Sequence, residues 1–415
     1  MKVSLQPALN DGNLDGSQPN SQRQLAISIS AIADNLNRNV PLNLCLILDH
    51  SGSMSGRPLE TVKKAACRIV DRLNPGDRLS VVVFDHRAKV LVSNQTVDDP
   101  ERIKQQINKL SADGGTAIDE GLQLGIKELT KGSKESISQA FLLTDGENEH
   151  GSNKRCLEFA KLAASYNLTL NTLGFGDNWN QDVLEQIADA GGGSLSHIQQ
   201  PDDAEAKFNQ LFTRIQTVSL TNAYLLFSLV PKVRLAELKP VAQVAPETIE
   251  LPVQQDPDGR LSVRIGDLMR DVERVILANL YISQLPVGRQ PIAQLQVRYD
   301  DPSQNVTGLL SEIFFVEANV TTSYQQQTDP KVQQYVLALA KYRQTQLAET
   351  KLQMGDRAGA ATMLQTAAKT ALQMGDMSAA TVLQTSATQL QAGQDLSEAD
   401  RKKTRIVSKT ILQDS

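Results

Sequence analysis

The sequence predicts an α/β protein with three parts: a doubly wound, mostly parallel sheet, an antiparallel β-sandwich and a small C-terminal helical bundle. Three observations predict this fold class. Between residues 42 and 217, short apolar runs alternate with segments of helical period, which is typical of a parallel sheet covered by helices. Beyond residue 218, short strand-like segments are separated by Pro, Asp and Gly turns. From about residue 329 the chain is helical in pattern and rich in Gln, Thr and Ala.

The chain is longer than a single hydrophobic core normally supports, so we expect several domains in its 415 residues. The expected parts are an N-terminal segment at 1–41, an α/β domain at 42–217, a β-sandwich at 218–322 and a helical region at 323–415.

The N-terminal segment divides into two stretches. Residues 11–23 are rich in turn-forming residues, which predicts a flexible loop. Residues 24–31 alternate apolar and polar side chains, which predicts a half-buried strand. Because this strand precedes the α/β domain, we expect it to join the later sandwich, with the α/β domain inserted between them.

The α/β domain is expected to alternate strands and helices. Strands are expected at 43–48, 79–84, 138–144, 168–175 and, shorter, near 195–198. Helices are expected near 58–73, 100–109, 117–130, 154–166, 180–190 and 202–217. In open sheets of this kind the ligand site lies outside the carboxyl ends of the strands. Polar residues that directly follow a strand are therefore the first candidates for a site.

The most informative loop follows the first strand of this domain. Leu44–Leu48 is an unbroken apolar run, as expected for a strand buried on both faces of a sheet. It continues as Asp-His-Ser-Gly-Ser, which places the oxygens of Asp49, Ser51 and Ser53 at alternate positions of one loop. Oxygen-only ligands suit a hard divalent cation such as Mg²⁺ or Mn²⁺. His50, which lies between two ligand positions, is expected to point away from the metal.

Two further segments add oxygen ligands. Gly114–Asp119 is a glycine turn that opens a helical pattern and presents the hydroxyl of Thr116. Phe141–Gly146 is a second apolar strand that ends in Asp-Gly, so the carboxylate of Asp145 emerges at a strand terminus. The nearby Glu120, Glu147 and Glu149 are expected on solvated loops, with electrostatic tuning of the site as the alternative.

The order D-x-S-x-S, then Thr, then Asp resembles the metal-ion-dependent adhesion site of von Willebrand factor type A domains. The segments LILDHSGSM, DGGTAIDEG and LLTDGE carry the resemblance, which covers roughly residues 42–217. It implies a Rossmann-like domain with a divalent metal. The metal ligands it implies, some direct and some through water, are Asp49, Ser51, Ser53, Thr116 and Asp145.

The resemblance also implies a function. In this family the metal keeps one coordination position open for an acidic side chain of a partner protein. We therefore expect a non-catalytic, metal-dependent protein–protein interaction module whose partner presents an Asp or Glu. The alternative is an accessory subunit of an ATPase-driven chaperone or metal-insertion complex. An enzyme is not expected, because the sequence has neither a G-x-S-x-G elbow with triad partners nor a phosphate-binding P-loop.

Composition excludes several other classes. The net charge of −5 is not gathered into tails, which argues against nucleic acid as the main partner. The four His are too few and scattered for a zinc site, and the three Cys are expected as buried thiols. No apolar run approaches the roughly 18 residues of a membrane span, and no signal peptide is evident. We expect a cytoplasmic protein; the sequence leaves its oligomeric state open.

Turn residues between short strand-like segments predict the sandwich, and an internal repeat predicts the helical region. Expected sandwich strands are Tyr224–Val230, Val233–Pro240, Glu247–Val253, Leu261–Ile265, Arg274–Ile282, Ile292–Tyr299 and Ile313–Glu317. The segment Leu352–Asp356 recurs as Leu372–Asp376, and in each the Gly-Asp pair suits a helix end followed by an N-cap. Three antiparallel helices are expected, at 330–353, 357–373 and 377–391. They either only pack together or offer a surface for a partner or for self-association.

A last short helix is expected to begin at Ser397. The basic cluster that follows, residues 401–405, is expected to be a solvated face. The alternative is a docking tail that is modified at Thr404 or Ser408.

Overall fold

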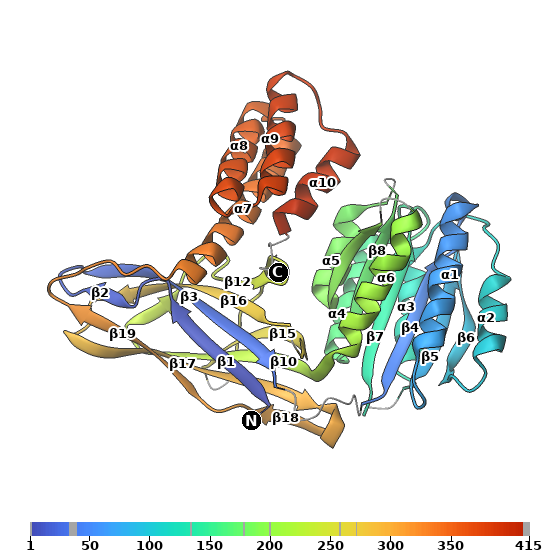
Figure 1. Ribbon diagram of the computed structural model, residues 1–415, viewed down its shortest axis with the longest axis horizontal. Helices are drawn as coiled ribbons and strands as arrows, with labels where there is room; N and C mark the ends of the chain where they lie inside the picture. The colour runs from blue at the N-terminus through green and yellow to red at the C-terminus, as the bar shows by residue number, and fades with distance from the viewer. Residues whose placement is uncertain are drawn as a thin grey trace.

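The computed structural model describes residues 2–32, 40–132, 135–176, 179–198, 201–256, 259–270 and 272–409, with only the backbone of residues 201–205. An α/β domain and a β-sandwich lie side by side, and a helical domain stands on the sandwich next to the α/β domain (Figure 1). This combination confirms the fold class predicted from the sequence.

The α/β domain is built on one sheet in the strand order β6-β5-β4-β7-β8-β9. Neighbouring strands are parallel except β5 and β6, which are antiparallel. The strands are β4 (Leu42–Asp49), β5 (Arg78–Phe84), β6 (Ala88–Thr96), β7 (Ile137–Thr144), β8 (Thr169–Phe175) and β9 (Gly192–Ile198). The edge strand β6 was not predicted. Every residue of β4 is buried, as expected for a central strand of a doubly covered sheet.

Helices cover both faces of this sheet. One apolar core joins alternate residues of β4 to α1, α2 and α6, and a second core joins the intervening residues to α3, α4 and α5. The helices are α1 (Arg57–Arg72), α2 (Pro100–Asn108), α3 (Ile118–Leu129), α4 (Asn153–Ser165), α5 (Gln181–Gly191) and α6 (Pro201–Gln216). The strand order reverses direction at β4, so the crevice beyond the carboxyl ends of β4 and β7 is where a ligand site is expected.

Two sheets form the sandwich around a single apolar core. The first contains β1 (Val3–Leu9), β3 (Asn20–Ala31), β11 (Val233–Leu235), β12 (Val241–Ala245), β13 (Ile249–Glu250) and β16 (Arg274–Ser283). The second contains β2 (Asn13–Asp15), β10 (Val218–Leu229), β14 (Gln254–Gln255), β15 (Leu261–Met269), β17 (Gly288–Asp301), β18 (Val306–Leu310) and β19 (Phe314–Thr321). Strand pairs are antiparallel, except that β2 runs parallel to β19.

The N-terminal strands belong to this sandwich. Strand β16 pairs with β3 along the whole length of β16, and the α/β elements are inserted between β3 and β10. The flexible loop predicted at residues 11–23 was wrong, because β2 and the first residues of β3 lie within it. These residues are polar, so their alternation does not reveal the strand. The strands predicted at 233–240 and 247–253 are shorter in the structure, where only β11 and β13 form.

The helical domain contains α7 (Pro330–Gln353), α8 (Arg357–Gln373), α9 (Met377–Gln391) and α10 (Glu398–Lys409). The Asp356 and Asp376 side chains cap α8 and α9, and the preceding Gly355 and Gly375 have φ of 79° and 78°, as the repeat predicted. Alanine and leucine side chains fill the core of the domain. The first half of α7 packs on the sandwich through Val332, Leu339 and Tyr342.

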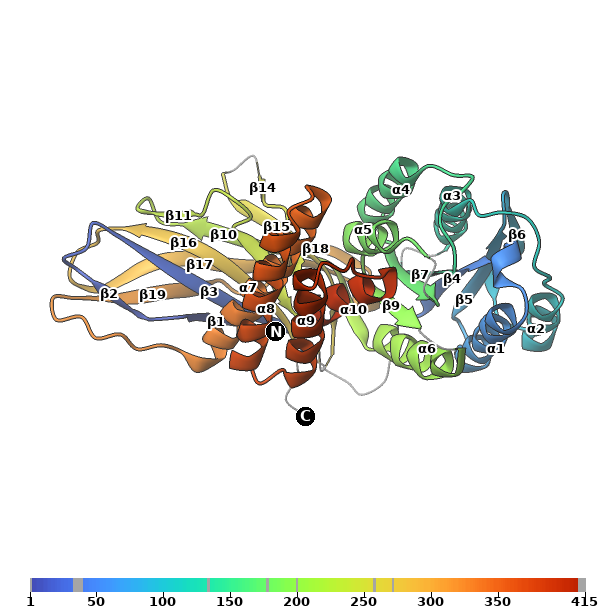
Figure 2. The same ribbon diagram turned by 90° about the horizontal axis from the view of Figure 1, so that it is seen from above.

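Helix α10 lies between the bundle and the α/β domain (Figure 2). The prediction that residues 401–405 form a solvated face was therefore wrong for part of the cluster. Lys402 and Thr404 keep only 4% and 5% of their surface exposed, and Arg405 forms ion pairs across the domain boundary. Ser408 is also fully buried, so neither residue considered for modification is accessible in this arrangement.

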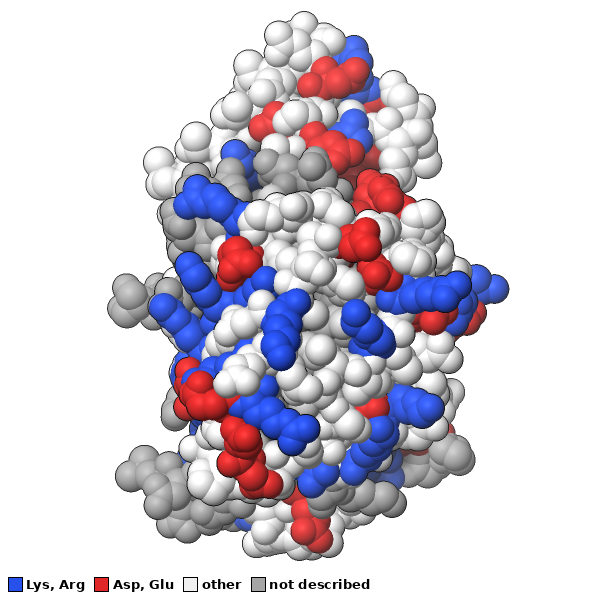
Figure 3. Space-filling model, turned by 90° about the vertical axis from the view of Figure 1, so that its right-hand side faces the viewer, with Lys and Arg blue, Asp and Glu red and all other residues white. Residues whose placement is uncertain are grey.

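The cysteines, the surface charges and the helix hydropathy complete the description of the fold. All three cysteines are free; Cys45 and Cys156 are buried, whereas Cys67 is only partly buried. On the side of the molecule formed by the α/β domain, basic and acidic side chains are intermixed (Figure 3). None of the helices within the described residues is both long and apolar enough to cross a bilayer.

Candidate metal centre

Asp49 is the deepest member of the predicted site. It is the last residue of β4 and is fully buried. Its Oδ1 accepts a hydrogen bond from the main-chain N–H of Ser51 at 2.8 Å, and its Oδ2 accepts one from the hydroxyl of Thr144 at 2.5 Å. Burial raises the pKa of Asp49 to about 6, against the opposing effect of these hydrogen bonds. The carboxylate is thus oriented, but it lacks the solvent that would normally stabilise its charge.

A chain of oxygens leads from this loop to the second carboxylate. The hydroxyls of Ser51 and Ser53 are 3.1 Å apart, and Ser53 donates to Oδ1 of Asp145 at 2.7 Å. Burial raises the pKa of Asp145, while the bond from Ser53 acts in the opposite direction. A β-carbon placed on Gly146 would lie 3.2 Å from the Thr116 hydroxyl oxygen and 3.7 Å from that of Ser53. All five predicted residues therefore converge on one small region.

Main-chain hydrogen bonds hold the three loops in place. The N–H of Gly52 donates to the carbonyl of Gly114 at 2.9 Å, and the N–H of His150 donates to the carbonyl of Thr116 at 2.9 Å. The loop after β4 is thereby joined to the Thr116 loop, and the Thr116 loop to the segment after β7. The ring of His50 lies against the carbonyl of Ser111 at 3.0 Å and takes no part in the oxygen cluster.

The donor set fits a hard divalent cation. Within the residues that the structure describes, Asp49 and Asp145 accept hydrogen bonds from hydroxyls and amides, and neither forms an ion pair. Two buried or half-buried carboxylates close to each other repel, and a cation between them would relieve both the repulsion and the lost hydration. The same part of the chain contains no group of three or more His, Cys, Asp or Glu able to hold a metal. A metal here would therefore depend on hydroxyl oxygens, which suits Mg²⁺ or Mn²⁺.

Sequence reasoning missed Thr144. Its hydroxyl is fully buried at the end of β7 and donates to Asp49, so it orients the deepest candidate ligand. The available signal was a hydroxyl in an otherwise apolar strand, since buried hydroxyls need a hydrogen-bond partner. That signal does not identify the partner, which is 95 residues away in the chain.

Comparison with known proteins agrees with this architecture. Residues 43–214 match the von Willebrand factor type A domain, and residues 330–414 match the Sll0103-like C-terminal alpha-helical domain. The chain is 59% identical over 414 residues to protein sll0103 of Synechocystis sp., covering 100% of this chain and 98% of that protein. The chain belongs to the Sll0103-like family of von Willebrand factor type A proteins. Members of the wider group often mediate protein–protein interactions.

Two further similarities cover different extents. The fold of the whole chain is similar to that of a von Willebrand factor type A protein from Catenulispora acidiphila, with a TM-score of 0.83, 19% identity and coverage of 100% of this chain and 98% of the other. Part of this chain is 29% identical over 193 residues to human inter-alpha-trypsin inhibitor heavy chain H3. That match covers 44% of this chain but only 22% of the heavy chain, so it concerns one domain of a much longer protein.

Proposed function

We propose that this protein is a non-catalytic interaction module that binds a carboxylate of a partner protein through a divalent metal. The metal, Mg²⁺ or Mn²⁺, would be held by Asp49, Ser51, Ser53, Thr116 and Asp145. The convergence of these residues at the carboxyl edge of the sheet is the observation that supports the proposal.

The charge balance of the site favours an acidic ligand. Two carboxylates and three hydroxyls neutralise a divalent cation without excess negative charge, so a further carboxylate can still be attracted. Mg²⁺ gives up its water reluctantly and usually keeps part of its shell, which leaves positions that an incoming ligand can take. Asp49 is buried while Ser53 is exposed, so the open side of the cluster faces solvent.

The surroundings of Ser51 support a non-catalytic function. A serine nucleophile needs a base within hydrogen-bond reach. The hydroxyl of Ser51 lies next to that of Ser53, whereas the neighbouring His50 contacts the carbonyl of Ser111. The adjacent serine and histidine therefore face different partners and do not form a dyad.

Metal titration of the purified protein tests the proposal. Isothermal titration with Mg²⁺ and Mn²⁺ would compare the wild type with Asp49→Asn and Asp145→Ala, and Glu149→Gln serves as the control because it removes an exposed carboxylate from the same loop region. Loss of one charged ligand is expected to weaken metal binding by more than about a hundredfold, since even loss of a supporting residue costs 10–100-fold.

A pull-down of proteins with and without EDTA then tests the second step. A partner that is retained with Mg²⁺, and is lost both in EDTA and with either Asp variant, would support metal-bridged recognition. Unchanged metal binding in both Asp variants would contradict the proposed ligand set.

A further inference from the structure

Helix α10 joins the helical domain to the α/β domain through ion pairs. Arg405 lies 2.6 Å from the carboxylate of Glu185 on α5 and also pairs with Asp182 at the start of that helix. Lys409 lies 2.5 Å from Glu185 and 3.2 Å from Asp189. The Glu185 side chain is only 4% exposed and that of Arg405 14%, whereas Asp182 is 56% and Asp189 28% exposed, so the outer part of the contact is open to water and salt. The contact therefore depends on basic side chains of α10 meeting an acidic face of α5.

The same helix covers a tryptophan. Trp179 lies two residues before the start of α5 and keeps 1% of its surface exposed. The ammonium group of Lys402 lies 4.5 Å from the centre of its indole ring, within the range of a cation–π interaction. The indole N–H donates to the carbonyl of Gly176 at 2.8 Å, which fixes the ring at the end of β8. The rest of the ring packs in the apolar core of the α/β domain and contacts His197, so α10 shields the part of Trp179 that Lys402 covers.

The boundary between the two domains is poorly filled. One cavity of about 280 Å³ and another of about 1040 Å³ lie along it, and residues of α5 and α10 line both. The opposite side of α10 packs on the bundle, where Val407 touches the apolar core and Thr404 lies 3.0 Å from the hydroxyl of Ser386. Helix α10 therefore packs closely on the bundle but meets the α/β domain through charged side chains beside two cavities.

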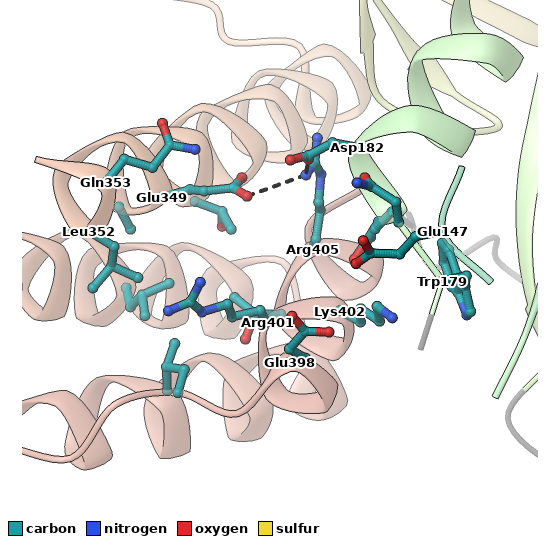
Figure 4. A pocket seen from close by; sticks show the side chains of 17 residues that line it. Glu147, Trp179, Asp182, Glu349, Leu352, Gln353, Glu398, Arg401, Lys402 and Arg405 are labelled. Carbon is teal, nitrogen blue, oxygen red and sulfur yellow. Dashed lines mark hydrogen bonds and ion pairs between the residues drawn. The ribbon is translucent and has the colours of Figure 1, made fainter. Parts of the chain in front are cut away.

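The smaller cavity has one wall residue that is close in sequence to the candidate metal site. Glu147 lies in its wall together with Lys402 and Arg405 (Figure 4). Glu147 follows Asp145 by two residues, so the two α-carbons are at most about 7 Å apart. A partner held at the metal would meet this boundary within one or two residues of its acidic ligand.

We propose that α10 is a reversible ionic clasp that holds the helical domain against the α/β domain. In the closed form seen here, Arg405 and Lys409 occupy the acidic face of α5. Release of these ion pairs separates α10 from α5, exposes the part of Trp179 that Lys402 covers and opens the boundary beside Glu147. The main-chain N–H of Thr248 in the sandwich donates to the carbonyl of Lys409 at 3.0 Å, and α7 packs on the sandwich, so both ends of the helical domain keep a contact with the sandwich.

The consequence for binding rests on the function proposed above: opening the clasp enlarges the surface that a metal-bound partner can touch. The clasp itself does not depend on that function. Its opening can therefore be measured without a partner and without metal.

Tryptophan fluorescence provides the test, because Trp179 is the one tryptophan of the sequence. Acrylamide quenching of the wild type is followed while NaCl is raised from about 0.05 to about 1 M, a range over which the screening length falls several-fold. Quenching is expected to increase with salt while circular dichroism stays constant. Quenching that does not change across this range, with the fold intact, would overturn the proposal.

Charge reversal sharpens the test. Arg405→Glu replaces the central cation of the clasp, and Lys403→Glu is the matched control because Lys403 is exposed on the same helix. Removing one partner from a largely buried ion pair should shift the ratio of closed to open molecules by about a hundredfold. Arg405→Glu should therefore be quenched more strongly at low salt than the control. Adding Glu185→Arg should restore part of the protection.

Equal quenching of Arg405→Glu, Lys403→Glu and wild type would overturn the clasp. If Arg405→Glu does not fold, the salt titration of the wild type still decides. A parallel Mn²⁺ titration separates the two proposals. Metal binding without a salt response of Trp179 rejects only the clasp, whereas a salt response without metal binding rejects only the proposed function.

Discussion

The α/β domain has two junctions of opposite character. At the amino ends of β7 and β8 it meets the sandwich through Asp267, which accepts hydrogen bonds from Gln139 at 2.7 Å and Thr169 at 2.8 Å. Arg274 adds a bond to the main-chain carbonyl of Asp267 at 2.9 Å, and the cavity there measures only about 20 Å³. At α5 the domain meets α10 through ion pairs beside cavities more than ten times larger.

This difference shows how one domain can be fixed and adjustable at the same time. A buried, filled and hydrogen-bonded junction is costly to separate, since every polar group in it would lose its partner. Partly exposed ion pairs beside a cavity can exchange their partners for water and salt at lower cost. The candidate metal site lies at the carboxyl edge of the sheet, which is the edge that adjoins the adjustable junction. Regulation of partner binding is therefore expected to act through α10 and not through the sandwich.

The largest expected effect comes from breaking the fixed junction. Burial and the nearby positive charge of Arg214 lower the pKa of Arg274 to about 10. The negative charge of Asp267 acts in the opposite direction and favours the charged form of Arg274. Asp267→Ala would leave Gln139 and Thr169 without an acceptor and remove a charge that supports Arg274. A loss of about 3 kcal/mol in the free energy of unfolding is expected. Urea unfolding followed by Trp179 fluorescence measures it.

Asp71→Ala is the control for this variant, because Asp71 is exposed and pairs with Lys104. Its removal should cost at most about 1 kcal/mol. If both variants lose the same amount, the fixed junction would not differ from an ordinary surface ion pair.

The second-largest effect is expected from metal binding at the carboxyl edge of the sheet. Under the proposed function, a cation between Asp49 and Asp145 would tie the loops after β4 and β7 together only in the folded protein. At Mg²⁺ concentrations about 100 times the dissociation constant, the free energy of unfolding should rise by about 2.7 kcal/mol. The same addition should leave Asp145→Ala unchanged. Stabilisation of both proteins by equal amounts would indicate that the ion binds elsewhere.

The parts of the molecule that the sequence predicted well are those with local signals. The apolar run Leu44–Leu48 predicts β4 from five consecutive residues and needs no information about distant partners. The repeated Gly-Asp pairs likewise mark the ends of α7 and α8 through turn and capping chemistry that acts within a few residues.

The parts it missed depend on contacts between distant residues. Lys409 and Asp189 are 220 residues apart, and a run of basic side chains next to the C-terminus looks like a solvated surface until its acidic partners are placed beside it. The polar start of β3 has the same problem, since only its pairing with β16 makes Asn20–Gln24 a strand. Turn composition and charge are local properties, whereas burial is decided by the tertiary fold.

The smallest expected effect separates the roles of two acids within the clasp. Asp189 faces Lys409 of α10, Glu185 of α5, Glu247 of the sandwich and Tyr342 of α7, and burial raises its pKa to about 6. The carboxyl group of Asp189 therefore binds a proton more tightly in the folded protein than in the unfolded chain, where its pKa is near 3.8. Stability from this group is present at low pH and is lost as the pH rises through about 6.

Asp189→Asn should consequently be more stable than the wild type at pH 7, and the two should converge near pH 4. The expected difference is about 1–2 kcal/mol, reduced from the full shift because the side chain is 28% exposed. Urea midpoints between pH 4 and pH 8 measure it, with the exposed Asp98→Asn as control. A destabilised Asp189→Asn at pH 7 would show that Asp189 supports Lys409 as strongly as Glu185 does. If Asp189→Asn is not destabilised at pH 7, closure depends mainly on Glu185, which pairs with both Arg405 and Lys409.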